Sequence, residues 1–259
     1  MSFIKTIAGK INNTEAKEVR IDSSTHSLQT LSYEHHEIHS GSHYYIEDVM
    51  TLAASATADF CLTTPDSGKE IHLLFAFDAD FKTTVEGYEG SVFAADGALV
   101  TQRNNNRVYS WIGSHASLAS SSLLADPNAA FTVDALIGYK VYNETDGSYG
   151  IITDNDATTA TTTLIGGTGN NFENGDLYEI NNSQLIVESG STITSLGRRI
   201  LAISSGTATN PTRGEPGGHS RSDELVLKRN TKYVFRFTSG VNDNAISYKA
   251  TWYEHTRRD

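Results

Sequence analysis

The stretch TKYVFRFT, residues 231–238, decides the fold class of this chain. Its aromatic residues fall at every second position, which is the pattern of a strand with one buried face. Similar stretches flank it, ELVLK at residues 224–228 and AISYKATWYE at residues 245–254. The short turn at Arg229 and Asn230 predicts that the first two stretches pair as an antiparallel hairpin.

Earlier parts of the chain show the same strand signals. FCLTT at residues 60–64 and EIHLLFAFD at residues 70–78 are separated by the turn-type sequence PDSG at residues 65–68, which predicts another hairpin. Further short strands are expected over residues 81–112. Residues 115–130, rich in Ala, Ser and Leu, are the one candidate helix or linker of any size. The sequence therefore predicts an all-β fold, an antiparallel β-sandwich or jelly-roll-like domain with an inserted small β module.

The inserted module is predicted from short strands separated by Gly and Asn turns over residues 131–180. Its glycine-rich segment at residues 166–169 lacks the Lys-Ser/Thr and the helix start of a phosphate-binding loop, so we interpret it as a hairpin turn. The predicted organisation is an N-terminal arm at residues 1–30, a main β-sandwich domain at residues 31–114 plus 184–259, and the module at residues 115–183.

Composition narrows the classes of partner. The 259 residues include 31 acidic and 20 basic residues, for a formal net charge of −11, so nucleic-acid binding is not expected. No apolar run is long enough to span a bilayer and the N-terminus lacks a signal-peptide core, so we expect no membrane partner and a soluble intracellular product. The single cysteine, Cys61, excludes an internal disulfide and suits a small buried hydrophobe.

Residues 33–45, YEHHEIHSGSHYY, hold four of the nine histidines, and two interpretations stay open. In one, the imidazoles ligate a metal, because neutral histidine is a common ligand. The zinc-protease spacing is not met, since His36 and His39 are one residue too close, and Gly41 with its bulky neighbours argues against a helix. In the other, the stretch is extended and contacts another subunit or its own chain.

A second polar stretch, NNNR at residues 104–107, predicts a kinked strand or bulge, because Asn tolerates left-handed backbone. Arg103 and Arg107 beside it are suited to clamp a carboxylate of a neighbouring subunit. We favour the contact interpretation for both stretches and predict no metal or cofactor site. The predicted subunit or capsid interface comprises His35, His36, His39, His43, Tyr44, Asn106 and Arg107.

Catalytic motifs are not found in the sequence. It contains no Gly-x-Ser-x-Gly elbow, no zinc-protease helix and no nucleotide fingerprint, so we predict that the protein is not an enzyme. An alternative that bound zinc, iron or manganese would favour is a metal-dependent cupin-like enzyme using His35, His36 or His39.

The order of several short motifs along the chain resembles virion structural proteins of tailed bacteriophages, of the decoration or cement type that coats the capsid. The motifs are HHEIHSG at residues 35–41, TTP at residues 63–65 with the following strand, NNR at residues 105–107, ELVLKRNTKY at residues 224–233 and WYE at residues 252–254. The middle module resembles a separate recurring phage segment through VYNETDGS at residues 141–148 and NGDLYEI at residues 174–180.

This resemblance implies a β fold and a non-enzymatic protein that binds and stabilises the head shell without a cofactor. The implied partners are the major capsid protein and other copies of the chain, with a homotrimer favoured because decoration subunits commonly sit at symmetry axes. The implied location is the capsid surface of the virion, after assembly in the host cytoplasm. The alternative within the same resemblance is a tail or fibre-associated receptor-binding protein.

Overall fold

The computed structural model describes residues 33–66, 68–207 and 224–256. The predicted arm at residues 1–30 lies outside the described residues. The chain divides into two compact units, residues 1–36 and residues 37–259, and the architecture below is that of the second unit. Among the described residues, no helix is both long enough and apolar enough to cross a membrane.

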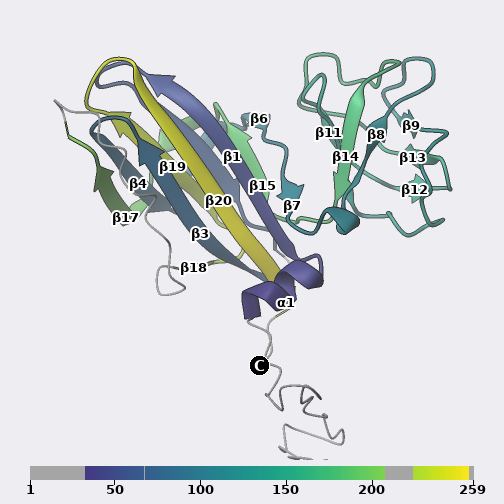
Figure 1. Cartoon of the computed structure of the whole chain (residues 1–259), viewed down its shortest axis with the longest axis horizontal. Coiled ribbons are helices and arrows are strands. Elements are labelled where there is room, and N and C mark those ends of the chain that lie inside the picture. The colour runs from purple at the N-terminus through teal and green to yellow at the C-terminus, as the bar shows by residue number, and fades with distance from the viewer. Residues whose placement is uncertain (1–32, 67, 208–223, 257–259) are drawn as a thin grey trace, which may run out of the picture. The chain divides into compact units, whose positions relative to one another are not determined.

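The first sheet has five antiparallel strands, and its three long central strands are labelled β3, β20 and β1 in Figure 1. In spatial order its strands are β18 (Leu225–Leu227), β3 (Lys69–Ala79), β20 (Asn244–Thr256), β1 (His43–Leu52) and β7 (Arg103–Asn104). Strand β20 pairs with β3 from Ile246 to Thr256 and with β1 from Asn244 to Tyr253, so the C-terminal strand is the centre of this sheet.

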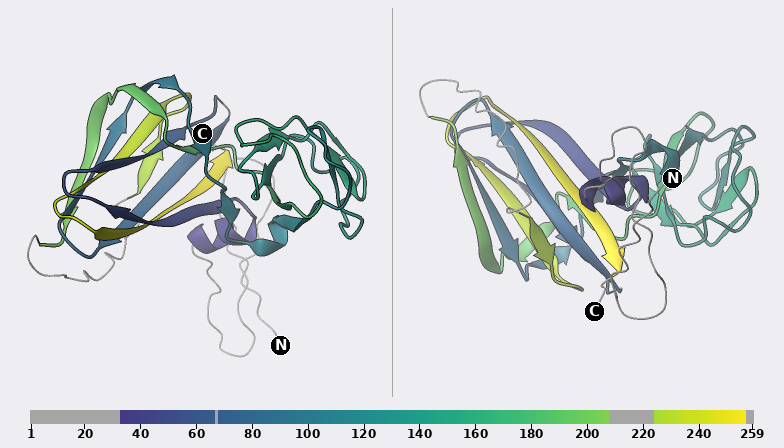
Figure 2. Two further views of the ribbon diagram at one scale, coloured as in Figure 1. Left: turned by 90° about the horizontal axis from the view of Figure 1, so that it is seen from above. Right: turned by 60° about the horizontal axis from the view of Figure 1, so that its bottom comes forward.

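The second sheet has six antiparallel strands and lies against the first (Figures 1 and 2). Its order is β17 (Arg198–Ser205), β4 (Thr83–Glu89), β19 (Lys232–Ser239), β2 (Thr57–Thr63), β15 (Ile186–Ser189) and β6 (Ala98–Leu99). A further two-stranded sheet pairs β5 (Val92–Ala95) with β16 (Thr192–Ser195). Strand β19, which carries the stretch at residues 231–238, lies between β4 and β2 and is buried at its aromatic positions.

One hydrophobic core fills the space between the two sheets. Phe60 and Phe235 of the second sheet stack at 4.8 Å, and Phe60 stacks at 5.4 Å on Tyr248 of the first. Phe75 of the first sheet lies 5.3 Å from Phe235. Because aromatic side chains bury large areas, this cluster dominates the apolar contact between the layers. The predicted all-β, sandwich-like fold with antiparallel sheets is confirmed.

The two predicted hairpins are wrong, because each turn carries the chain from one sheet to the other. Strand β2 belongs to the second sheet and β3 to the first, and β18 belongs to the first and β19 to the second. The two turns lie together, since Asn230 N donates to Pro65 O at 3.2 Å and Thr64 Oγ1 donates to Lys228 O at 2.7 Å. Alternation of apolar and polar residues shows which face of a strand is buried. Two strands that face each other from opposite sheets have the same alternation as two strands that pair side by side.

A separate hydrophobic core is formed by residues of the central part of the chain. One sheet there has the order β11 (Tyr149–Ile151), β10 (Lys140–Asn143), β14 (Leu177–Asn181) and β8 (Trp111–Ser114). A second has the order β12 (Asp154–Asn155), β13 (Thr159–Thr161) and β9 (Leu123–Ala125). Strand β8 ends at Ser114, just before the predicted start of the module at residue 115, and it pairs with β14. The module boundaries stay a prediction.

Residues 115–130 form no helix, which corrects one of the two expectations for this segment. They contain the short strand β9 and turns held by side chains. The Ser120 hydroxyl accepts bonds from the backbone of Ser122 and Leu123, and Asp126 Oδ1 accepts one from Asn128 N. Ser and Asp side chains compete with helical hydrogen bonds in this way, which outweighs the helix propensity of the Ala and Leu residues.

Helix α1 (Tyr33–His39) corrects the expectation that Gly41 excludes a helix. Gly41 has φ of +75°, its N–H donates to Ile38 O at 3.1 Å, and Ser42 N donates to Glu37 O at 3.1 Å. These two bonds form the glycine cap common at helix C-termini. The glycine therefore ends the helix instead of preventing it, and the bulky residues that follow lie in β1.

Candidate interface around helix η1

The two polar stretches predicted to form an interface lie side by side. Strand β1 pairs with β7, so that Tyr44 lies opposite Asn104. Asn104 Nδ2 donates to Gly41 O at 2.6 Å, and Asn105 N donates to His43 O at 2.9 Å. His43 and Asn105 are 62 residues apart in sequence. These contacts join their two segments into one structural unit.

His43 and Tyr44 are buried within this unit. The His43 ring stacks on Tyr253 at 6.4 Å and its Nδ1 lies 2.6 Å from Asn105 Nδ2. The Tyr44 ring stacks on Trp252 at 6.0 Å, and burial raises the pKa of the Tyr44 hydroxyl well above its usual range. Both side chains are buried and hold β1 against the C-terminal strand, and their predicted interface role stays a prediction.

The other predicted histidines lie on α1. His36 and His39 are exposed, and His35 lies in the same helix. The backbone oxygen of His39 accepts a bond from Asn106 Nδ2 at 3.4 Å. The interface role of these three histidines stays a prediction.

Asn106 is the N-cap of the short 3-10 helix η1 (Arg107–Tyr109), which follows β7 in the chain. Its Oδ1 accepts a bond from Val108 N at 3.2 Å, and its own N–H donates to Asn104 Oδ1 at 2.8 Å. An Asn side chain suits this position because it satisfies backbone donors that the helix leaves unpaired. The expected kinked strand is in fact the end of β7 followed by η1.

Apolar side chains around η1 face solvent. Val108 is 85% exposed, Ile112 is 54% exposed and Tyr109 is 45% exposed. The Tyr109 ring packs over Gly41, where an added Cβ would lie 2.5 Å from Tyr109 Cγ, so this glycine permits the contact between η1 and the end of α1. We define the η1 surface as His39, Asn106, Val108, Tyr109 and Ile112.

The sequence analysis named His39 and Asn106 of this surface and missed its apolar members. Val108, Tyr109 and Ile112 resemble a strand in sequence, and strand apolar residues are normally buried. The Asn run before these residues could have indicated the short helix, because Asn is a preferred helix N-cap as well as a common residue in bulges and turns.

Arg103 and Arg107 clamp a carboxylate, as expected, but it belongs to the same chain. Arg107 Nη1 and Nη2 lie 3.0 and 3.3 Å from the two oxygens of Glu179 on β14, a bidentate arrangement. Arg103 Nε lies 3.7 Å from Glu179, and Ser110 Oγ donates to it at 3.1 Å. The buried Glu179 carboxylate therefore has its charged and hydrogen-bonding partners within the chain, and these contacts hold η1 against β14.

We expect Arg107→Ala to lower the free energy of unfolding by about 2 kcal/mol, the usual scale for hydrogen bonds to a buried charge. Arg199→Ala is the matched control, because Arg199 pairs with Glu86 at 2.6 Å on an exposed face and should contribute less than about 1 kcal/mol. Urea titrations of the two variants give the comparison. Equal losses would contradict the role given to Glu179.

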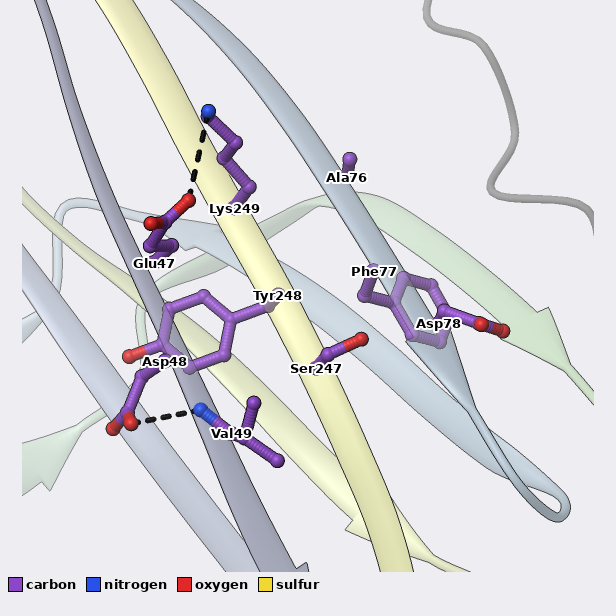
Figure 3. A pocket seen from close by; sticks show the side chains of 9 residues that line it. All are labelled: Glu47, Asp48, Val49, Ala76, Phe77, Asp78, Ser247, Tyr248 and Lys249. Carbon is purple, nitrogen blue, oxygen red and sulfur yellow. Dashed lines mark hydrogen bonds and ion pairs between the residues drawn. The ribbon is translucent and has the colours of Figure 1, made fainter. Parts of the chain in front are cut away.

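A shallow hollow lies elsewhere, on the outer face of the first sheet (Figure 3). Its lining residues are Glu47, Asp48, Val49, Ala76, Phe77, Asp78, Ser247, Tyr248 and Lys249. Lys249 Nζ lies 3.6 Å from Glu47, so the ammonium among these side chains already has a carboxylate partner. This hollow is an acidic surface depression and lacks a nucleophile paired with a base.

Comparison with known proteins adds no relative. The chain matches no protein-family model and no curated protein. Its sheets define it as an all-β, sandwich-like protein.

Proposed function

We propose that the protein is a non-enzymatic virion structural protein of a tailed bacteriophage, a capsid decoration or cement subunit that binds the major capsid protein and stabilises the head shell. The observation that carries the proposal is the spatial grouping of the motifs that resemble such proteins. Within the second unit, the motif residues 37–41, 105–107 and 252–254 belong to three distant parts of the sequence. His43 lies opposite Tyr253, and Glu254 N donates to Ser42 O at 2.9 Å, next to the contacts between β1 and β7.

This grouping supports an assembly function in a specific way. Buried rings at Tyr44 and Trp252 fix the end of the first sheet, and the η1 surface beside it exposes apolar side chains with a polar rim. Interfaces between proteins commonly combine an aromatic and apolar centre with polar surroundings. In the proposed assembly, the η1 surface contacts the capsid protein or a neighbouring subunit, and the module of residues 115–183 faces solvent.

The proposal places the protein on the capsid surface of the virion, after assembly in the host cytoplasm, as a closed homo-oligomer. A trimer suits the three-fold and pseudo-three-fold positions of a shell. No catalytic step is part of this function.

A second candidate is a tail or fibre-associated receptor-binding protein. The observation that favours it is the exposed apolar side chains on the central part of the chain, which has a core of its own. Leu118 is 88% exposed, and Val133 and Ile165 are also exposed. Exposed apolar side chains of this kind suit a binding head.

Co-sedimentation with phage shells that lack the protein distinguishes the two candidates, with host cells as the parallel sample. We expect the purified chain to pellet with the shells and to stay in the supernatant with the cells. Binding to cells without binding to shells would contradict the decoration function and would support the receptor-binding one.

A further inference from the structure

A cluster of histidine and carboxylate side chains lies on the outer face of the first sheet. In the antiparallel pairing of β3 with β20, His255 lies opposite Glu70 and Tyr253 lies opposite His72. Because alternate residues of a strand point to the same face, Glu70 and His72 share the face that His255 also occupies. The pairing thus brings together three potential ligands from two neighbouring strands.

The donor atoms of the three side chains are close to one another. Glu70 Oε2 lies 4.0 Å from His72 Nε2 and 3.9 Å from His255 Nε2, and one ligand atom from each residue lies within 4.8 Å of the others. Ligands about 2.0–2.1 Å from a tetrahedral zinc ion stand about 3.3 Å apart. Small rotations of the side chains therefore suffice to close the cluster around an ion.

The surroundings of His72 orient it as a ligand. Its Nδ1 is hydrogen-bonded to the Glu224 carboxylate, and Tyr253 Oη donates a hydrogen bond to the same carboxylate at 2.7 Å. His72 Nε2, the nitrogen directed to Glu70, is buried and has no hydrogen-bond partner among the described residues. A carboxylate on one imidazole nitrogen, with the other nitrogen left for the ion, is the usual arrangement around metal-binding histidines.

We propose that Glu70, His72 and His255 bind one divalent transition-metal ion of the zinc class. Two imidazoles and one carboxylate favour such ions over calcium or magnesium, which prefer oxygen ligands alone. The three side chains retain partial exposure, so an ion held by them keeps a position open to water. The ion would link the end of β20 to β3, and its binding would stabilise the folded state by an amount that rises with the logarithm of the free ion concentration above the dissociation constant.

This site differs from the metal interpretation of the sequence, which involved His35, His36 or His39. In the described part of the chain, Glu70, His72 and His255 form the one group of three or more ligand-type side chains close enough to share an ion. His39 lies on α1 outside this group, so it supplies a matched control.

The test is isothermal titration of the metal-stripped, untagged full chain with ZnCl₂, together with the visible absorption spectrum after addition of CoCl₂. We expect one Zn²⁺ per chain and the absorption bands of Co²⁺ with nitrogen and oxygen ligands. His255→Gln and Glu70→Gln should each weaken Zn²⁺ binding more than about tenfold. His39→Gln should leave the affinity and the stoichiometry unchanged.

Absence of stoichiometric Zn²⁺ binding by the unsubstituted chain would overturn the proposal. So would unchanged binding in both His255→Gln and Glu70→Gln, or a loss in His39→Gln equal to theirs. Circular dichroism of each variant checks the fold, and having two separate ligand variants keeps the test decisive if one of them fails to fold.

Discussion

Glu254→Ala is expected to lower the free energy of unfolding by about 3–5 kcal/mol, the scale for removing one member of a buried charged network. Glu254 lies on β20 and is only 2% exposed. Its carboxylate accepts bonds from Ser183 Oγ at 2.9 Å, Gln184 N at 2.9 Å, Leu185 N at 3.3 Å and Trp252 Nε1 at 3.2 Å. Alanine leaves these donors buried without an acceptor, and each unsatisfied donor is costly.

The same carboxylate compensates a buried cation. Lys140 Nζ donates to Leu185 O at 2.8 Å, and burial lowers the pKa of Lys140 to about 8 while the charge of Glu254 acts in the opposite direction. Loss of Glu254 should therefore lower the pKa of Lys140 further, because the ammonium form loses its nearby anion. Residues 183–185, where the chain leaves β14 and approaches β15, depend on this one side chain.

Equilibrium unfolding in urea measures the effect, and Glu47→Ala is the control. Glu47 is also a carboxylate paired with a lysine, but it lies on the exposed outer face of the first sheet (Figure 3). Its removal should cost less than about 1 kcal/mol. Similar unfolding midpoints for the two variants would contradict the large contribution to the free energy of unfolding that is assigned to the hydrogen bonds of Glu254.

Val108→Glu is expected to weaken binding to phage shells about 30-fold, equivalent to about 2 kcal/mol, if the η1 surface contacts the shell. Val108 is 85% exposed, so a glutamate should be tolerated by the isolated protein. In a closed interface the added carboxylate would lose its water without gaining a partner, which is unfavourable. Sedimentation of shells with increasing amounts of variant gives the affinity.

Leu118→Glu is the matched control, because Leu118 is 88% exposed and belongs to the module proposed to face solvent. It should bind shells with the affinity of the unsubstituted chain. Equal binding by both variants would remove the η1 surface as the contact, and a loss confined to Leu118→Glu would place the contact on the module.

The sequence was sufficient for the class of fold but not for the pairing of strands. Alternation at residues 231–238 correctly predicts a strand with a buried aromatic face, and β19 is that strand. The pattern contains no information about which strand lies beside it. The pairs that build the sheets, such as β3 with β20, join segments far apart in sequence, so the turns at residues 65–68 and 229–230 were wrongly interpreted as hairpins.

The candidate sites show the same limit. The stretch at residues 33–45 and the Asn run were recognisable by composition, and the structure does bring them together. That His43 and Tyr44 are buried depends on Tyr253 and Trp252 lying opposite them, which is a fact of register. The cluster of Glu70, His72 and His255 likewise exists because two distant strands pair in one register, and no local spacing indicates it.

The measurement that tests the proposed function most directly is a saturation titration of shells lacking the protein, with the bound amount quantified per copy of the major capsid protein. The decoration function predicts a plateau at one fixed ratio, because each subunit occupies a site repeated by the symmetry of the shell. Absence of binding, or bound protein that rises without a plateau, would contradict it.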